Sequence, residues 1–129
     1  MKKLIYALPL LLFAACGNDE SAMEEMSTDE LQEHIYEDGF DDEVLYLDVR
    51  EEDEFAEKHI SGFTNIPMND VMEDPAIVGE DQEVIILCQT QNRSIEVGEH
   101  LIENGYDADH LTVVMGGIAD YEGDTVAEE

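Results

Sequence analysis

The sequence predicts an α/β fold in which a parallel sheet carries helices on both faces. Three segments support this prediction, at 44–49, 84–87 and 111–115. They are apolar nearly throughout, which is typical of strands that are buried on both faces. Segments with helical patterns separate them, and strands that alternate with helices indicate a parallel sheet.

The first expected helix begins at Ser27, because Ser27 and Glu30 have the spacing of a capping box. It ends at Asp38-Gly39, since glycine commonly terminates helices. A short helix is expected at 51–58, and its acidic start should be solvated. The remaining elements are expected in this order: a brief strand at 64–66, a helical turn at 71–72, a turn at 79–82, the strand at 84–87, a helix at 94–104, the strand at 111–115 and a short helix at 118–122.

The composition is strongly acidic. The chain has 129 residues, with 34 acidic and 5 basic side chains and a formal net charge of −29. Apolar residues make up 43% and are gathered into runs, so we expect one folded domain with an acidic surface. No basic patch is available to neutralise phosphates, which excludes nucleic-acid binding. Such acidity fits a saline environment, where salt screens self-repulsion; an ordinary soluble acidic protein is the alternative.

Residues 1–15 are expected to be a signal peptide. Lys2 and Lys3 precede an apolar run from Leu4 to Ala15 that is too short to span a membrane as a helix. The small residues directly before Cys16 resemble the lipobox of bacterial lipoproteins, in which the cysteine is lipidated. An ordinary secretory signal is the alternative.

A lipidated Cys16 would anchor the chain to a membrane without spanning it. This predicts a lipoprotein of the cell envelope that faces the periplasm or the exterior. Residues 16–26 are then the lipidated cysteine and an acidic tether, 27–123 the folded domain and 124–129 a frayed tail. We expect a monomer. Lipidation of Cys16 would also leave Cys88 as the only free thiol, which suits a reactive role.

Cys88 directly follows the strand at 84–87 and precedes the helix at 94–104. The first amides of a helix lack internal acceptors and carry a positive partial charge, so such a place favours a nucleophilic thiolate. Successive amides of the loop 88–94 can converge on a group attached to the sulfur. Arg93 adds a positive charge to this loop.

Four residues separate Cys88 from Arg93. Protein tyrosine phosphatases have a longer loop that surrounds a phosphate, so the spacing disfavours a phosphatase or an arsenate reductase. The shorter loop fits a smaller electrophile, such as the outer sulfur of thiosulfate. On this motif alone, a buried structural cysteine is an equally good interpretation.

Several separated segments resemble the rhodanese domain: Leu47-Asp48-Val49-Arg50-Glu51, Glu54-Phe55, His59-Ile60-Ser61-Gly62-Phe63-Thr64-Asn65-Ile66-Pro67, the strand that ends at Cys88, Arg93-Ser94 and Val113-Val114-Met115-Gly116-Gly117-Ile118. The resemblance runs in consistent order from about Ser27 to Tyr121. It implies a rhodanese-like α/β fold, a five-stranded parallel sheet with helices on both faces. It also implies sulfur transfer through a persulfide on Cys88, with no metal and no organic cofactor.

The resemblance also implies roles for single residues. Cys88 would attack a small sulfur donor such as thiosulfate, and a thiol or cyanide would accept the sulfur. Arg93 either steadies the substrate's charge, which we favour, or ties the loop to a carboxylate. Asp48 and Arg50 are expected mainly to form an ion pair that frames the loop, and contact with the substrate is the alternative. The other loop residues would surround the sulfur: Gln89, Thr90, Gln91, Asn92 and Ser94.

Gln91 departs from the family pattern, because many members have glycine at this place. We expect Gln91 to narrow the pocket or to change the donor preference. It also keeps a second function open, that of a non-catalytic sulfur carrier or a protein-docking module. His34, His100 and His110 lack the spacing of metal ligands, and no metal site is expected from them.

Overall fold

The computed structural model of the chain describes residues 23–128. The predicted signal peptide at 1–15, the predicted lipidation site Cys16 and most of the predicted tether lie outside these residues. Within the described part, no helix is both long enough and apolar enough to cross a membrane.

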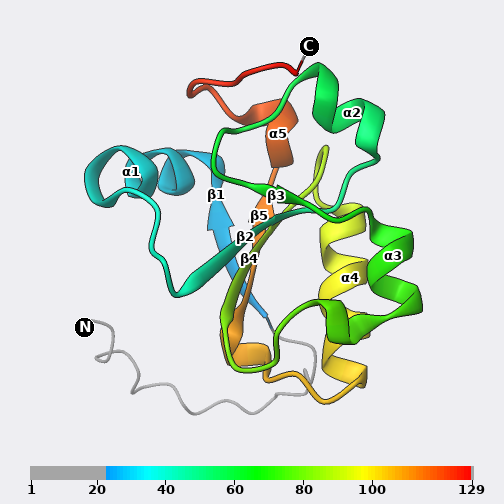
Figure 1. Cartoon of the computed structure of the whole chain (residues 1–129). Coiled ribbons are helices and arrows are strands. Elements are labelled where there is room, and N and C mark those ends of the chain that lie inside the picture. Colours follow the sequence, from blue (N-terminus) through cyan, green and yellow to red (C-terminus); the bar gives the residue numbers. More distant parts are fainter. Residues whose placement is uncertain (1–22, 129) are drawn as a thin grey trace.

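A five-stranded parallel sheet forms the centre of the molecule, with the strand order β1-β5-β4-β2-β3 (Figure 1). This confirms the predicted fold class. The strands are β1 (Glu24–Ser27), β2 (Val44–Asp48), β3 (Thr64–Asn65), β4 (Glu83–Leu87) and β5 (Leu111–Met115). β4 is the central strand and pairs with β2 on one side and β5 on the other. The carboxyl ends of these strands therefore meet at one edge of the sheet.

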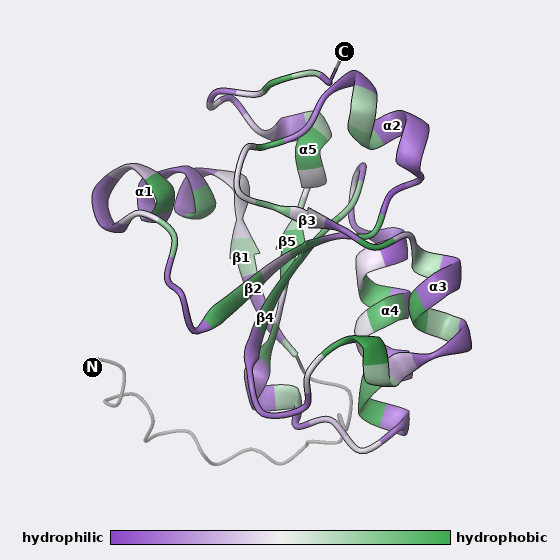
Figure 2. Cartoon of the chain, in the orientation of Figure 1, coloured by the Kyte–Doolittle hydropathy of each residue, from purple (hydrophilic) through white to green (hydrophobic). Residues whose placement is uncertain are grey.

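Helices cover both faces of the sheet (Figure 1). They are α1 (Thr28–Asp38), α2 (Glu52–Glu57), α3 (Met68–Glu73), α4 (Asn92–Glu103) and α5 (Gly117–Asp120), with the short 3-10 turns η2 (Pro75–Ile77) and η3 (Ala108–His110). Side chains of α3 and α4 pack in one apolar core, and those of α1, α2 and α5 in a second. Figure 2 shows hydrophobic residues along β2, β4 and β5 and a mixture of hydrophobic and hydrophilic residues in the helices.

The central strand contributes to both cores in alternation. Val84, Ile86 and Cys88 belong to the core under α3 and α4, whereas Ile85 and Leu87 belong to the other. This alternation follows from the two-residue period of a strand. It explains why the run 84–87 is apolar without interruption, since each face meets a layer of helices. The side chain of Cys88 therefore lies on the α3 and α4 side of the sheet.

β1 is a strand where the sequence predicted part of the tether. Its residues pair in parallel with β5, from Glu24 opposite Thr112 to Ser27 opposite Met115. Two of its four residues are glutamates and it has one neighbour only, at the edge of the sheet. Such a strand carries no apolar run, so its sequence does not distinguish it from a linker.

The expected helix start at Ser27 agrees with the structure. The Ser27 hydroxyl accepts a hydrogen bond from the Glu30 amide at 3.0 Å, and the Glu30 carboxylate accepts one from the Ser27 amide at 2.9 Å. This is the predicted capping box. α4, in contrast, begins at Asn92, before the expected start at 94.

The described part of the tail is attached to the domain, whereas the sequence suggested a frayed end at 124–129. Val126 and His59 exchange two backbone hydrogen bonds, of 2.9 and 2.8 Å. The Glu128 amide donates to the carbonyl of Ala56 in α2 at 2.8 Å. These bonds involve the backbone alone, so the acidic tail sequence gives no sign of them. They hold the end of the chain against α2.

Candidate active site

Cys88 lies at the carboxyl end of the central strand, as the sequence predicted, and it is only 1% exposed. Its sulfur lies near the start of α4. The amide of Ser94, the third residue of that helix, is 3.4 Å from Sγ and donates toward it. The first amides of a helix have no acceptor within the helix, so this one is free to stabilise a negative charge on the sulfur.

The loop between the strand and the helix presents further donors. Within residues 23–128, the amides of residues 89–93 donate to no other protein group. The hydroxyl of Ser94 is buried and also has no partner there. Gln89, Thr90 and Asn92 are exposed around the loop. Successive amides without acceptors in one loop are groups that can bind an anion, and one of them, that of Ser94, donates toward the sulfur.

The loop rests on the start of α5. The amides of Ile118 and Ala119 donate to the carbonyls of Cys88 and Gln89 at 2.9 and 3.0 Å. Gly117 has a φ of 63°, and a β-carbon there would overlap the carbonyls of Gln89 and Thr90. Glycine is therefore required at this place for both its backbone angle and its lack of a side chain.

Gln91 braces the loop through its side chain. It occupies the N-cap position of α4 with a φ of −152° and a ψ of −10°, so its φ lies outside the left-handed region that favours glycine. Its Oε1 accepts a hydrogen bond from the amide of Gly116 at 3.0 Å. The position therefore needs no glycine in this chain. The half-buried side chain of Gln91 is committed to the turn before α5.

Asp48 and Arg50 form the predicted ion pair, with Arg50 Nη2 2.9 Å from Asp48 Oδ2. The two residues are 0% and 2% exposed, so the pair lies in the interior. Arg50 also donates to the carbonyls of Glu54 and Lys58, at 3.3 and 2.6 Å. These bonds fix α2 above the end of β2. In addition, the Val49 amide bonds to the Leu87 carbonyl at 3.0 Å, directly before Cys88.

Arg93 contacts a carboxylate that the sequence did not single out. Its two terminal nitrogens donate to the two oxygens of Glu54, at 2.8 and 3.2 Å. The hydrogen bond and charge of Arg93 lower the pKa of Glu54, and Glu54 in turn raises the pKa of Arg93. The sequence predicts a solvated acidic helix start at this place, whereas the structure pairs Glu54 with Arg93. The segment Glu54-Phe55, which resembles the family motif, was the available signal for a more specific role.

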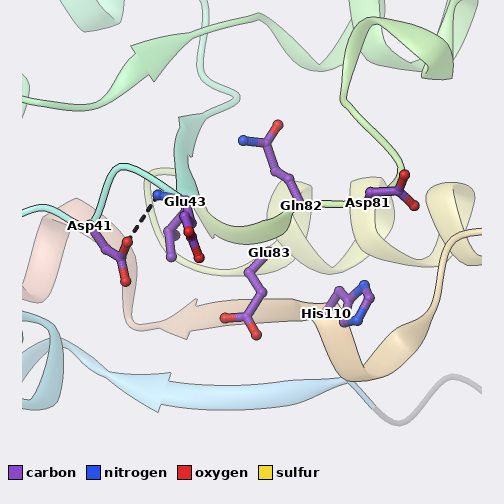
Figure 3. Close-up of a pocket in the computed structure, with 7 residues that line it drawn as sticks. Asp41, Glu43, Asp81, Gln82, Glu83 and His110 are labelled. Carbon is purple, nitrogen blue, oxygen red and sulfur yellow. Dashed lines mark hydrogen bonds between the residues drawn. The ribbon is translucent and has the colours of Figure 1, made fainter.

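Two surface cavities lie at opposite ends of the sheet. One of about 570 Å³ lies beside the first residues of β2 and β4, and Figure 3 shows its carboxylates and His110. It contains no nucleophile and is remote from the carboxyl ends of the strands. The other, of about 440 Å³, lies between α2 and α3 and is lined by Glu51, Glu52, Asp53, Pro67, Asn69 and Asp70. Among the described residues, no three His, Cys, Asp or Glu side chains form a group able to hold a metal ion.

Three histidines, His34, His59 and His100, have structural contacts. His59 is buried, stacks on Phe55 with ring centroids 3.8 Å apart, and bonds to the Phe55 carbonyl at 2.7 Å. His34 bonds to the hydroxyl of Tyr46 at 2.8 Å, and His100 to the carbonyl of Met72 at 3.0 Å. None of these three side chains lies at the Cys88 loop.

The fold is thus a parallel α/β sheet with one buried cysteine at the start of a helix, in a loop whose amides have no acceptor among residues 23–128. The comparison with known families makes the assignment specific. A family model described as the rhodanese-like domain matches residues 27–124, and the chain belongs to this family.

Relatives and solved structures agree with this assignment. The chain is 34% identical over 103 residues to the Bacillus subtilis (strain 168) protein named "Putative sulfurtransferase YtwF", a match that covers 80% of this chain and 94% of the relative. It is 29% identical over 85 residues to "Putative sulfur carrier protein YrkF" of the same strain, covering 66% of this chain and 45% of that protein. A crystal structure of a rhodanese-like domain protein from Staphylococcus aureus superimposes with a TM-score of 0.68 at 27% identity, covering 83% of this chain and 100% of the other.

Proposed function

We propose that this chain is a sulfurtransferase that moves a sulfane sulfur from thiosulfate or a similar donor to a thiol or cyanide through a persulfide on Cys88. The observation that carries the proposal is the surroundings of the sulfur. The Ser94 amide lies 3.4 Å from Sγ, and the loop amides beside it have no acceptor within residues 23–128. Preorganised donors of this kind stabilise charge on a bound sulfur.

The proposed reaction has two displacement steps. The Cys88 thiolate attacks the outer sulfur of thiosulfate, a bond forms between these two sulfurs, and sulfite leaves with the electron pair of the broken bond. An acceptor thiolate, or cyanide, then attacks the outer sulfur of the persulfide. The Cys88 thiolate is regenerated, and the acceptor leaves as a persulfide or as thiocyanate. Neither step requires an added oxidant or reductant.

The other predicted site residues support this reaction in different ways. We assign Gln91, Asp48 and Arg50 to holding the loop and α2, in keeping with their contacts to Gly116, Glu54 and Lys58. Ser94 is assigned to the bound sulfur, because its amide donates toward Sγ and its hydroxyl has no partner among the described residues. The exposed side chains of Gln89, Thr90 and Asn92 are assigned to the entering donor and acceptor.

Intact mass measurement tests the proposal directly. The full chain with Cys16→Ser is measured as prepared, after thiosulfate and after subsequent cyanide. We expect the mass to rise by one sulfur atom and then to return to its first value. Cys88→Ser in the same background is the control and should not change. An unmodified mass after thiosulfate, under conditions where the protein is folded, would overturn the proposal.

A sulfur carrier or docking module is the second candidate function. The 1% exposure of Cys88 favours it, because a covered sulfur is protected from small acceptors. A carrier would take up one sulfur but release it slowly to cyanide or free thiols. Multiple turnovers with thiosulfate and cyanide would support the enzyme, and one loading event without turnover would support the carrier.

The cellular placement is also a proposal. A lipid on Cys16 would hold a monomeric domain at the membrane, facing the periplasm or the exterior, with the acidic segment before β1 as a tether. Expression of the full chain in a bacterium with labelled fatty acid tests this. The wild-type protein should carry label and sediment with membranes, and Cys16→Ser should do neither. Equal labelling of both proteins would contradict it.

A further inference from the structure

The positive charge beside the reactive loop is already neutralised. Both terminal nitrogens of Arg93 bond to the carboxylate of Glu54, at 2.8 and 3.2 Å. The side chains are 27% and 34% exposed, so the pair lies at the surface and within reach of an entering molecule. A carboxylate in this two-pronged geometry uses two of the five N–H donors of the arginine and compensates its charge toward a second anion.

Glu54 is held in position from three sides. Its Oε1 also accepts the amide of Glu51 at 2.9 Å, as the N3 partner of that helix start. Its backbone carbonyl accepts from Arg50, which is itself fixed by Asp48. The Glu54 carboxylate is therefore an acceptor that its own helix start holds in place.

In the described part of the chain, neither of the other two basic side chains takes the place of Arg93 as a free positive charge beside the loop. Residues 23–128 contain three basic side chains. Arg50 is buried against Asp48, and Lys58 is an exposed residue at the end of α2. The cavity between α2 and α3 carries four carboxylates, those of Glu51, Glu52, Asp53 and Asp70. A dianion such as thiosulfate therefore approaches a negative surface without a free positive charge to receive it.

We infer that Glu54 determines which sulfur donors this site accepts, and that it favours persulfides whose leaving thiol is neutral or cationic over anionic donors. The inference rests on the proposed sulfurtransferase function and narrows its substrate class. In the favoured step the Cys88 thiolate takes the outer sulfur of an alkyl persulfide. The bond between the donor's two sulfurs breaks, and the electron pair leaves on the departing thiolate.

Matched small donors test the inference. We use 2-aminoethyl persulfide, which is cationic at its amine, 2-carboxyethyl persulfide, which is anionic, and thiosulfate. The rate at which Cys88 gains one sulfur is followed by intact mass in the full chain with Cys16→Ser. This protein should react faster with the amine than with the carboxylate. Glu54→Gln frees Arg93 and keeps the cap on the Glu51 amide, so it should raise the rates with both anionic donors by about three- to tenfold.

Two further variants separate an effect of Glu54 itself on the loading rate from a general effect of net charge. Glu57→Gln removes one charge from an exposed site on the same helix and should leave the preference unchanged. Glu54→Gln combined with Arg93→Gln should lose the gain of the single variant, because the gain requires the freed guanidinium. Circular dichroism is used to check that each variant is folded.

The outcomes distinguish this inference from the function on which it rests. If no donor loads Cys88, the proposed function fails. If all donors load at equal rates and Glu54→Gln behaves like Glu57→Gln, the sulfurtransferase function stands and the role of Glu54 is wrong. A gain that persists without Arg93 would also overturn the inference, since general charge would then explain it.

Discussion

The side chain of Gln91 accepts a hydrogen bond from the backbone amide of Gly116, at 3.0 Å and across 25 residues of sequence. This bond joins the reactive loop to the turn that precedes α5. The first amides of α5 bond in turn to the carbonyls of Cys88 and Gln89. The loop is thus held by the end of β5 as well as by its own helix, and each part of this support can be tested.

Replacing Gln91 with alanine should loosen the loop. The amide of Gly116 loses its acceptor, which we expect to cost about 1 kcal/mol of unfolding free energy and to slow sulfur loading on Cys88. Urea unfolding and the mass-based loading assay measure the two effects. Gln89→Ala is the control for the unfolding measurement only, since that side chain is exposed but is assigned to the entering donor. Equal unfolding free energies of the two variants would show that the bond to Gly116 is unimportant.

Gly117→Ala should be more damaging than an ordinary glycine replacement. The new β-carbon would overlap the carbonyls of Gln89 and Thr90. Gly105 is a matched control, because its φ of 98° is equally unfavourable for alanine but nothing lies within 4 Å of the position. Backbone strain alone costs about 1–3 kcal/mol, so Gly105→Ala measures this part and Gly117→Ala should exceed it. Sulfur loading should fall in Gly117→Ala only.

Arg50→Met should strongly destabilise the domain. It leaves the carboxylate of Asp48 buried without a partner, and breaking a buried pair in this way costs about 3–5 kcal/mol. Asp48→Leu combined with Arg50→Met removes both charges and should recover part of the loss. Urea unfolding of the two single variants and the double variant measures the coupling between the side chains. If the losses of unfolding free energy in the two single variants simply add in the double variant, Asp48 and Arg50 do not interact directly.

The pair of Glu54 and Arg93 predicts a pH dependence of stability. Arg93 holds the pKa of Glu54 below its ordinary value of 4.5. A carboxylate with a lowered pKa in the folded protein stabilises the fold above the unfolded pKa, and this contribution disappears as the pH falls through the folded pKa. The unfolding free energies of wild type and Glu54→Gln should therefore differ by a constant amount above about pH 6 and converge below pH 4.5. A difference between the two proteins that is unaffected by acid would argue against the pair.

Salt should accelerate the reaction with thiosulfate. The chain carries 34 acidic side chains, and repulsion between them and a dianion is screened as ionic strength rises. The initial rate is measured against sodium chloride concentration over the range in which circular dichroism shows an unchanged fold. A flat or falling profile would contradict the expected repulsion. The same measurement with 2-aminoethyl persulfide should show no acceleration.

Local sequence patterns predicted most of the fold. The runs that form β2, β4 and β5 are contiguous and apolar, because each lies between two layers of helices. The capping box at Ser27 is equally local, since its partners are three residues apart. β1 escaped prediction because an edge strand with two glutamates needs no apolar run. The attachment of the tail could not be predicted from the sequence, because it uses backbone groups alone.

In the candidate site, too, the features that depend on neighbouring residues were predicted and the long-range contacts were not. The place of Cys88 after the central strand and the pairing of Asp48 with Arg50 follow from short sequence segments. The two contacts that shape the loop do not, because Arg93 and Glu54 lie 39 residues apart and Gln91 and Gly116 lie 25 apart. In a chain with 34 acidic residues, the sequence offers too many candidate partners for one arginine.

The bonds between the chain's end and α2 have a practical consequence. Val126 and Glu128 bond to His59 and Ala56, at the end of the helix that carries Glu54. A purification tag or reporter fused after Glu128 would therefore emerge beside α2, which carries the carboxylate that we infer to influence donor choice. Shortening the chain before Val126 would remove these bonds from α2, and the change would reach the Cys88 loop through the pair of Glu54 and Arg93. This end of the described chain is accordingly a poor place for a fusion partner.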